Sequence, residues 1–310
     1  MKGLLIIAPL ILVIALGMVL RAAGFMNEPD KDRLTKLLYW IVLPMLLFRT
    51  TYLAGGDVAQ QGNLFIANHA AMLAVQVVAL LIAVPLTHRG DRPRQAVSVM
   101  AAARSNNVYL GLPVCTLALQ NAGTEAASIF LAVTLPGYNL ISILWGEVIR
   151  SGGIGIATLR SISLRILKNP LILSSLTGLI AAQLRLPVPG TIMTSMKLVS
   201  DMAIGIALLS LGISLEFSGL AGAFRRAWHD ALIKLILHPA LTWAFLTIWP
   251  VPEIFLRVSV IITAMPTAVN TFIVAKGMKL DDRYASEIVA VSTILAPMTI
   301  PVWIALLGIK

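Results

Sequence analysis

Cysteine is nearly absent from this sequence, and so is most of the charge that a soluble domain carries. The single cysteine, Cys115, excludes an intramolecular disulfide and any metal site built from several cysteines. Its apolar neighbours indicate a packing residue. Only 12% of the 310 residues are charged, whereas soluble globular domains have roughly 25%. Hydrophobic residues make up 58% of the chain, so the composition indicates a membrane protein with no room for a soluble domain.

Acidic residues are scarcer than basic ones, with 14 Asp and Glu against 24 Lys and Arg and a net charge of +10. In a soluble protein this balance would favour nucleic acid as a partner. In a membrane protein, basic residues that collect in cytoplasmic loops are a simpler explanation. We therefore expect the lipid bilayer as the surroundings of the chain and no nucleic acid.

Catalytic and metal-binding motifs are lacking as well. The sequence contains no His-Glu-x-x-His, no Gly-x-Ser-x-Gly and no pair of aspartates inside an apolar run. A membrane-embedded enzyme would need a nucleophile with its base, or a set of metal ligands. The sequence therefore predicts no catalytic residue, no cofactor and no metal site.

Long apolar runs, bounded by charges or turn residues, predict an all-α polytopic membrane protein with ten transmembrane helices of roughly 20 residues each. Their ranges are 3–22, 35–54, 64–87, 94–121, 126–149, 168–186, 193–216, 227–250, 255–277 and 285–308. Sixteen of the 24 basic residues fall in the odd-numbered loops and six on the opposite side. The excess predicts that the odd-numbered loops are cytoplasmic and that both termini lie outside.

Short matches indicate an internal repeat. Pro9-Leu-Ile-Leu recurs as Pro170-Leu-Ile-Leu, and Ala127-Ser-x-x-x-Ala-Val-Thr recurs as Ala285-Ser-x-x-x-Ala-Val-Ser, at nearly the same offset. Convergent helix composition is the alternative explanation. A repeat of five helices is odd-numbered, so its second copy must enter the membrane from the opposite face, as in many secondary transporters. We predict repeats at 1–150 and 168–310 with a cytoplasmic linker at 151–167.

The predicted helix at 94–121 contains a cluster of residues that interrupt helices. Asn106 and Asn107 precede Gly111 and Pro113. Proline removes a backbone donor and glycine permits unusual backbone angles. At 1.5 Å per residue, Asn106 lies about 18 Å into the segment, close to the bilayer midplane.

The predicted helix at 255–277 has a matching interruption at Pro266 and Asn270. If both segments unwind where they meet, free backbone groups and amides gather at the midplane, and such backbone is tolerated only where it is buried or lines a cavity. Half-helix N-termini at this depth favour an anion. Two ordinary proline kinks remain the alternative.

Few ionisable residues lie inside the predicted helices. Arg104 either attracts an anionic substrate or makes a structural ion pair, since an arginine at this depth is costly. Asp201 either carries a coupling proton, pairs with Arg104, or lies at the interface one turn after Lys197. We interpret His69 and His238 as core histidines, and Lys234 is ambiguous.

The residues of the two interruptions resemble those of the auxin efflux carrier family, whose bacterial members include proteins assigned as malonate and malate permeases. The family has an Asn, a Gly five residues later, and then x-Pro, which correspond to Asn106, Gly111 and Pro113. It also has Pro-x-x-x-Asn, which corresponds to Pro266 and Asn270. The resemblance extends over nearly the whole chain.

The resemblance implies a fold similar to that of bile-acid and sodium–proton transporters. Broken helices 4 and 9 (94–121 and 255–277) would cross in a core domain with helices 3, 5, 8 and 10. Helices 1, 2, 6 and 7 would form a scaffold, which in some relatives mediates homodimerisation. The small residues frequent in the family are replaced here by Asn107 and Val108, which leaves the shape of the first crossing segment open.

We therefore predict a secondary transporter in a bacterial inner membrane that moves a small organic anion, such as a carboxylate, by alternating access. The alternatives are a sodium-coupled symporter of bile-acid type, a passive channel and a membrane-embedded enzyme. The predicted substrate-binding residues are Arg104, Asn106, Asn107, Gly111, Pro113, Pro266 and Asn270, with Asp201 as a candidate for ion coupling.

Overall fold

A computed structural model describes residues 2–54, 62–83, 89–151, 170–214, 220–269 and 271–309. In these ranges the regular elements are helices, joined at one point by an isolated β-bridge. The helices, with η marking π-helical turns, are α1 (Lys2–Ala22), α2 (Glu28–Leu37), η1 (Leu38–Val42), α3 (Leu43–Ala54), α4 (Gly62–Val78), η3 (Ala79–Ala83), α6 (Arg92–Ala103), η4 (Asn107–Gly111), α7 (Leu112–Ser151), α9 (Pro170–Gln183), α10 (Gly190–Ser200), α11 (Ala203–Ser214), α12 (Leu220–Leu232), η5 (Ile233–Leu237), α13 (His238–Ile248), α14 (Glu253–Thr263), α15 (Thr271–Gly277) and α16 (Asp282–Leu306).

Long apolar helices confirm that the chain is a polytopic membrane protein. Five helices in the described ranges are long and apolar enough to cross a membrane: Glu28–Leu53, Gly62–Leu81, Gly190–Ile213, Ala221–Ile248 and Asp282–Leu306. They overlap the helices that the sequence predicts at 35–54, 64–87, 193–216, 227–250 and 285–308. A shorter apolar helix, Ile11–Ala22, overlaps the first predicted one.

The boundary predicted between helices 94–121 and 126–149 lies at a reversal inside α7. Gln120 has φ 56° and ψ −143°, which no α-helix contains. The chain folds back there, so that the hydroxyls of Thr116 and Thr124 lie 2.8 Å apart. An ideal Cβ at Gly123 would lie 2.3 Å from the carbonyl oxygen of Cys115, so only glycine fits this close approach. The element α7 is therefore two helices joined by a tight turn.

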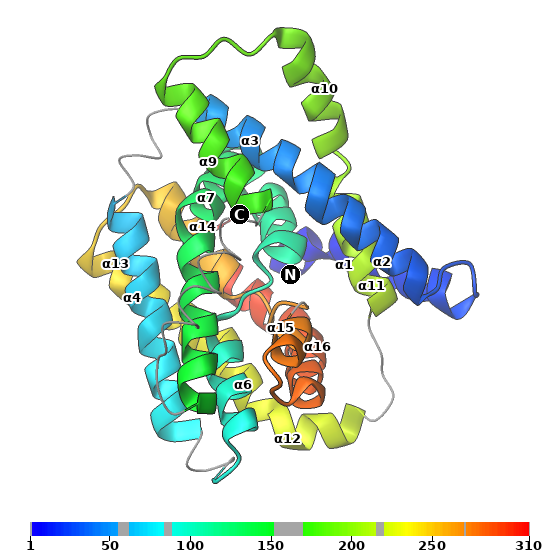
Figure 1. The fold of residues 1–310 in the computed structure, drawn as a ribbon, viewed down its shortest axis with the longest axis vertical. Coiled ribbons are helices and arrows are strands. Elements are labelled where there is room, and N and C mark those ends of the chain that lie inside the picture. The colour runs from blue at the N-terminus through cyan, green and yellow to red at the C-terminus, as the bar shows by residue number, and fades with distance from the viewer. Residues whose placement is uncertain are drawn as a thin grey trace.

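The helices pack in pairs that bring distant parts of the chain together (Figure 1). α3 lies against α9 and α1 against α11, while α2 and α10 contact the same group. Away from this group, α4 lies beside α13. α6, α7, α12, α14, α15 and α16 form a third group, linked by contacts such as those of α7 with α6 and α14 and those of α16 with α12 and α15.

Glycines allow two of these pairs to approach closely. An ideal Cβ at Gly17 in α1 would lie 2.5 Å from the carbonyl oxygen of Leu209, and one at Gly212 in α11 would lie 2.1 Å from that of Ile14. A Cβ at Gly178 in α9 would lie 2.3 Å from the hydroxyl of Thr51 in α3. Small residues at such contacts let helix backbones pack tightly in a membrane, where the hydrophobic effect does not hold helices together.

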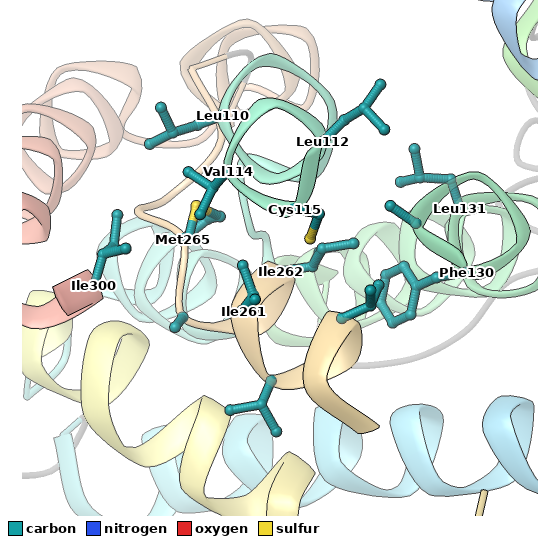
Figure 2. Packing of buried hydrophobic residues seen from close by; sticks show 14 of the residues in the cluster. Leu110, Leu112, Val114, Cys115, Phe130, Leu131, Ile261, Ile262, Met265 and Ile300 are labelled. Carbon is teal, nitrogen blue, oxygen red and sulfur yellow. The ribbon is translucent and has the colours of Figure 1, made fainter. Parts of the chain in front are cut away.

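Apolar side chains pack together beside the two interrupted segments (Figure 2). Leu110, Val114 and Cys115 come from η4 and the first turns of α7, and they gather with Ile262 and Met265 from the end of α14. Cys115 is fully buried, which confirms its interpretation as a packing residue. This cluster fixes the distance between the two interrupted segments.

We expect Gly212→Ala to lower the thermal stability of the protein. The new methyl group would clash with the backbone of α1, and overpacking of this kind costs about 1–3 kcal/mol. Gly205→Ala is the matched control, because it lies on the same helix and a Cβ there meets nothing within 4 Å. Thermal unfolding in detergent should show a lower midpoint for Gly212→Ala alone; equal midpoints would contradict the close contact.

Candidate functional site

The first interrupted segment begins where α6 ends at Ala103. Arg104 leaves the helical conformation with ψ 86°, and Asn106 has φ −75° and ψ 63°. The chain turns back into a helix at Asn107, where η4 begins and continues into α7. Asparagine side chains compete with helical backbone hydrogen bonds. Pro113 has no amide hydrogen, and it lies just after the π-helical turn η4, where the regular helical hydrogen bonding is already disturbed.

The second interrupted segment begins where α14 ends at Thr263. Ala264 and Met265 turn the chain, Pro266 cannot continue the helical hydrogen bonds, and α15 begins at Thr271. Asn270, which the sequence places in this site, lies outside the described residues. Both interruptions therefore lie where the sequence predicts them.

The two segments meet in an antiparallel bridge between Ser105 and Thr267. The amide of Asn106 donates to the carbonyl of Pro266 at 2.8 Å, and the amide of Ala268 donates to the carbonyl of Arg104 at 2.8 Å. These bonds replace those that the broken helices lose, because a backbone amide left unpaired away from water is costly.

A side chain from α16 completes the bridge. The hydroxyl of Ser292 accepts a hydrogen bond from the amide of Thr267 at 3.1 Å and donates to the carbonyl of Val289. The sequence offered one signal for this residue, because Ser292 belongs to the repeat match at 285–292. Its role as a support for the second interrupted segment was not predicted.

Polar side chains at the bridge are buried and lack hydrogen-bond partners within the described structure. They are the hydroxyls of Ser105 and Thr267, both polar atoms of Asn106, and the Oδ1 atom of Asn107. Asn106 is only 1% exposed and Thr267 is fully buried. Buried polar atoms are almost always paired in native proteins, so this cluster can bind a ligand or water.

Two buried cations flank the bridge, each at the C-terminal end of a broken helix. Arg104 directly follows α6, and its Nε donates to Thr271 Oγ1 at 3.3 Å. Lys234 comes from η5, and its Nζ donates to the carbonyl of Thr263, the last residue of α14, at 2.5 Å. The C-terminal end of a helix carries partial negative charge, so cations are stabilised there. The sequence left Lys234 ambiguous because its partner comes from a distant segment.

A buried carboxylate lies one turn before Lys234. Asp230 is 1% exposed, and it accepts hydrogen bonds from the hydroxyls of Ser98 and Tyr284. Among the side chains whose burial the structure describes, the buried charged groups are thus the cations Arg104 and Lys234 and this one carboxylate. If all three are ionised, the excess of positive charge favours an anionic ligand.

The remaining predicted residues differ in their surroundings. Gly111 and Pro113 are buried behind the bridge, and an ideal Cβ at Gly111 would lie 3.4 Å from both the Asn106 carbonyl oxygen and a methylene carbon of Ile262. Asp201 lies at the exposed end of α10, where its carboxylate binds Lys197 at 2.7 Å. Its carboxylate therefore pairs with Lys197 and not with Arg104.

Comparisons with known proteins find membrane transport proteins among the relatives of this chain. Residues 154–304 match the family model described as "Membrane transport protein". A protein of Methanothermobacter thermautotrophicus described as an uncharacterized transporter is 24% identical, with 96% of each chain covered. The "Putative malonate transporter" of Rhizobium meliloti is 23% identical over 86% of this chain and 84% of its own. Auxin efflux carrier component 1 of Arabidopsis thaliana is 28% identical over 46% of this chain and 24% of its own.

Apolar helices, interrupted segments and these matches define a membrane transport protein rather than an enzyme. More narrowly, the second half of the chain matches this membrane transport family, and an auxin efflux carrier component is among the relatives, in line with the resemblance of the two interruptions.

We expect Ser292→Ala to destabilise the protein, because the buried amide of Thr267 would lose its acceptor. A buried donor left unpaired costs about 1–3 kcal/mol. Ser286→Ala is the matched control, since Ser286 is exposed on the same helix and bonds only to its own helix. The comparison is by thermal unfolding, and an unchanged midpoint for Ser292→Ala would show that the bridge does not depend on this hydroxyl.

Proposed function

We propose that this protein is a secondary carrier that moves a small organic anion, such as a dicarboxylate, across the bacterial inner membrane by alternating access. The observation that carries the proposal is the cluster at the Ser105–Thr267 bridge, where unpartnered buried amides and hydroxyls lie between two buried cations. The amide and hydroxyl groups can donate to carboxylate oxygens, and the cations compensate the charge of the anion.

The predicted substrate contacts follow from this geometry. Asn106 and Asn107 would donate to the carboxylate, while Arg104 and the start of η4 would supply positive potential. The first turn of a helix leaves amide groups without intrahelical partners, and its N-terminus attracts negative charge. Gly111, Pro113 and Pro266 would shape the backbone around the ligand, and we retain Asn270 as a proposed contact from the sequence.

The name of the Rhizobium meliloti relative refers to malonate, which supports a carboxylate as the substrate class. Malonate carries two carboxylates a short distance apart, and its charge suits a site with two cations. We therefore place short dicarboxylates first among the compounds to be tested.

Alternating access would follow from two groups of helices that move past each other. The packing supports a scaffold of α1, α2, α3, α9, α10 and α11, because these elements contact one another extensively. The core would contain the bridge and the remaining helices. In this proposal the chain is divided into repeats at 1–150 and 168–310 joined at 151–167, with both termini outside, and the scaffold would also mediate a homodimer.

Packing at two glycines supports the inverted repeat. Gly17 in the first predicted helix lies against the seventh, and Gly178 in the sixth predicted helix lies against the second. An inverted repeat relates the first helix to the sixth and the second to the seventh, so these two contacts would be equivalent. Gly17 and Gly178 also have the same offset as the sequence match that begins at Pro9 and Pro170.

Reconstituted protein should exchange labelled malonate or malate across liposome membranes. Flux should saturate with concentration and accelerate when unlabelled substrate is present on the opposite side, because a carrier must return its binding site to the original side of the membrane after each transport step. Absence of flux for every carboxylate in a broad panel would refute the proposal, and unsaturable flux would favour a channel. Replacement of sodium by choline tests the sodium-coupled alternative in the same assay.

We expect Asn106→Ala to lower malonate exchange by about tenfold or more, because a hydrogen bond to a charged group is worth roughly 1.5–3 kcal/mol. Asn121→Ala is the matched control, since Asn121 is an exposed amide in α7. Initial exchange rates of folded protein give the comparison. If Asn106→Ala exchanges malonate as fast as Asn121→Ala, the bridge is not the binding site.

A further inference from the structure

Three ionisable side chains lie along one buried face of the helix formed by α12, η5 and α13. Asp230, Lys234 and His238 follow one another at intervals of four residues, and their exposed fractions are 1%, 0% and 0%. Residues four apart lie above one another on a helix. Ionisable groups inside a membrane protein are costly to bury, and they commonly mark paths for ions or protons.

The imidazole of His238 has no hydrogen bond to either nitrogen in the described structure. Its ring lies 6.4 Å from that of Tyr138 in α7, measured between centroids, and the ring of Tyr138 lies 5.4 Å from that of His69 in α4. The hydroxyl of Tyr138 is also buried without a partner, whereas the His69 imidazole has backbone partners at Phe65 and Thr134. The Nδ1 atom of His69 contacts the carbonyl of Phe65.

Three unpartnered polar atoms, the two nitrogens of His238 and the hydroxyl of Tyr138, would be costly in an inert core, because each buried group loses its hydrogen bonds with water. Imidazole is the side chain best suited to bind and release protons near neutral pH. A tyrosine whose ring lies near two imidazoles can pass a proton from one to the other through water. The cluster therefore has the parts of a proton-binding site.

Neighbouring elements present few other charges to His238. Lys234 lies one turn away on the same helix and interacts with it electrostatically. α14 faces it with mostly apolar and hydroxyl side chains, and the charged residues of that helix, Glu253 and Arg257, pair with each other at its exposed start. Asp230 lies two turns away and is held by Ser98 and Tyr284.

We propose that His238, together with Tyr138 and His69, is a proton-binding site that couples anion transport to protons, with Lys234 as the link to the bridge. The inference rests on the proposed function of the bridge. A neutral imidazole takes one proton from water on one side of the membrane and returns it to water on the other. Each malonate dianion would thus cross with one proton, and the cargo would carry one net negative charge.

Lys234 provides the physical basis of the coupling. Its ammonium group is bound to Thr263 beside the bridge, and it repels a second positive charge on His238. An anion at the bridge offsets this repulsion, so anion and proton favour each other's binding. Such coupling is reciprocal, so the proton must strengthen anion binding by the same factor.

The test uses two measurements on the full chain in liposomes with labelled malonate. The first is exchange at equal pH on both sides, and the second is accumulation driven by a pH gradient. We expect His238→Gln to lose about tenfold in gradient-driven accumulation while exchange falls by less than about threefold. His229→Gln is the matched control, because it removes an imidazole from the same helix that contacts Asp230 at 3.4 Å rather than the His238–Tyr138–His69 cluster, and it should retain both activities.

Tyr138→Phe provides a second variant that keeps the aromatic ring, so it decides the question if His238→Gln does not fold. It should also lose gradient-driven accumulation more than exchange. Gradient-driven accumulation that persists in folded His238→Gln, or in Tyr138→Phe, overturns the proposal. If wild-type protein exchanges malonate but does not accumulate it in response to a pH gradient, the proton site alone is overturned. If it exchanges no carboxylate of the panel, the proposed function is overturned as well.

Discussion

The rest of the structure depends on a pair of backbone hydrogen bonds between two segments that cannot remain helical. Asn106 donates to Pro266, and Ala268 donates to Arg104. In the interior of a membrane no water is available to satisfy a broken helix, so interrupted backbone must find protein partners. Each interruption supplies the hydrogen-bond partners that the other lacks, so the bridge at Ser105 and Thr267 forms because both helices break where they meet.

The bridge also determines where charge can be buried. Two helix C-termini converge on it, and each receives a cation, Arg104 for α6 and Lys234 for α14. The backbone at these ends carries partial negative charge that lowers the cost of the burial. An anion near the two cations can further reduce the electrostatic cost of burying them. The same interruption of the helices thus accounts for both the backbone pairing of the bridge and the two buried cations beside it.

Packing around the bridge holds the two segments at a fixed separation. Apolar side chains from η4, α7 and α14 fill the space beside it (Figure 2), and Gly111 lets the two backbones come close. At the periphery, glycine contacts join α1 to α11 and α3 to α9. A rigid centre and tightly packed outer pairs are the properties that two bodies need if they are to move past each other without losing their internal structure.

Much of this architecture followed from local chemistry. Apolar runs predicted the long helices, because a bilayer accepts little else. The interruptions followed from Asn106, Pro113 and Pro266, since prolines and amides weaken helical hydrogen bonding where they cluster, although a lone proline such as Pro9 lies inside an unbroken helix. The sequence also indicated the family, because the order of these few residues is specific.

Only the tertiary structure decided which groups meet. It paired Lys234 with Thr263 and Ser292 with Thr267, brought His238 to Tyr138, and placed Asp201 beside Lys197 rather than Arg104. These partners, apart from Lys197, come from separate helices, and nothing in the spacing of the residues identifies them. Whether a buried side chain is paired, and with what, depends on the packing of whole helices, whereas the break in a helix depends on the residues within a turn or two of it.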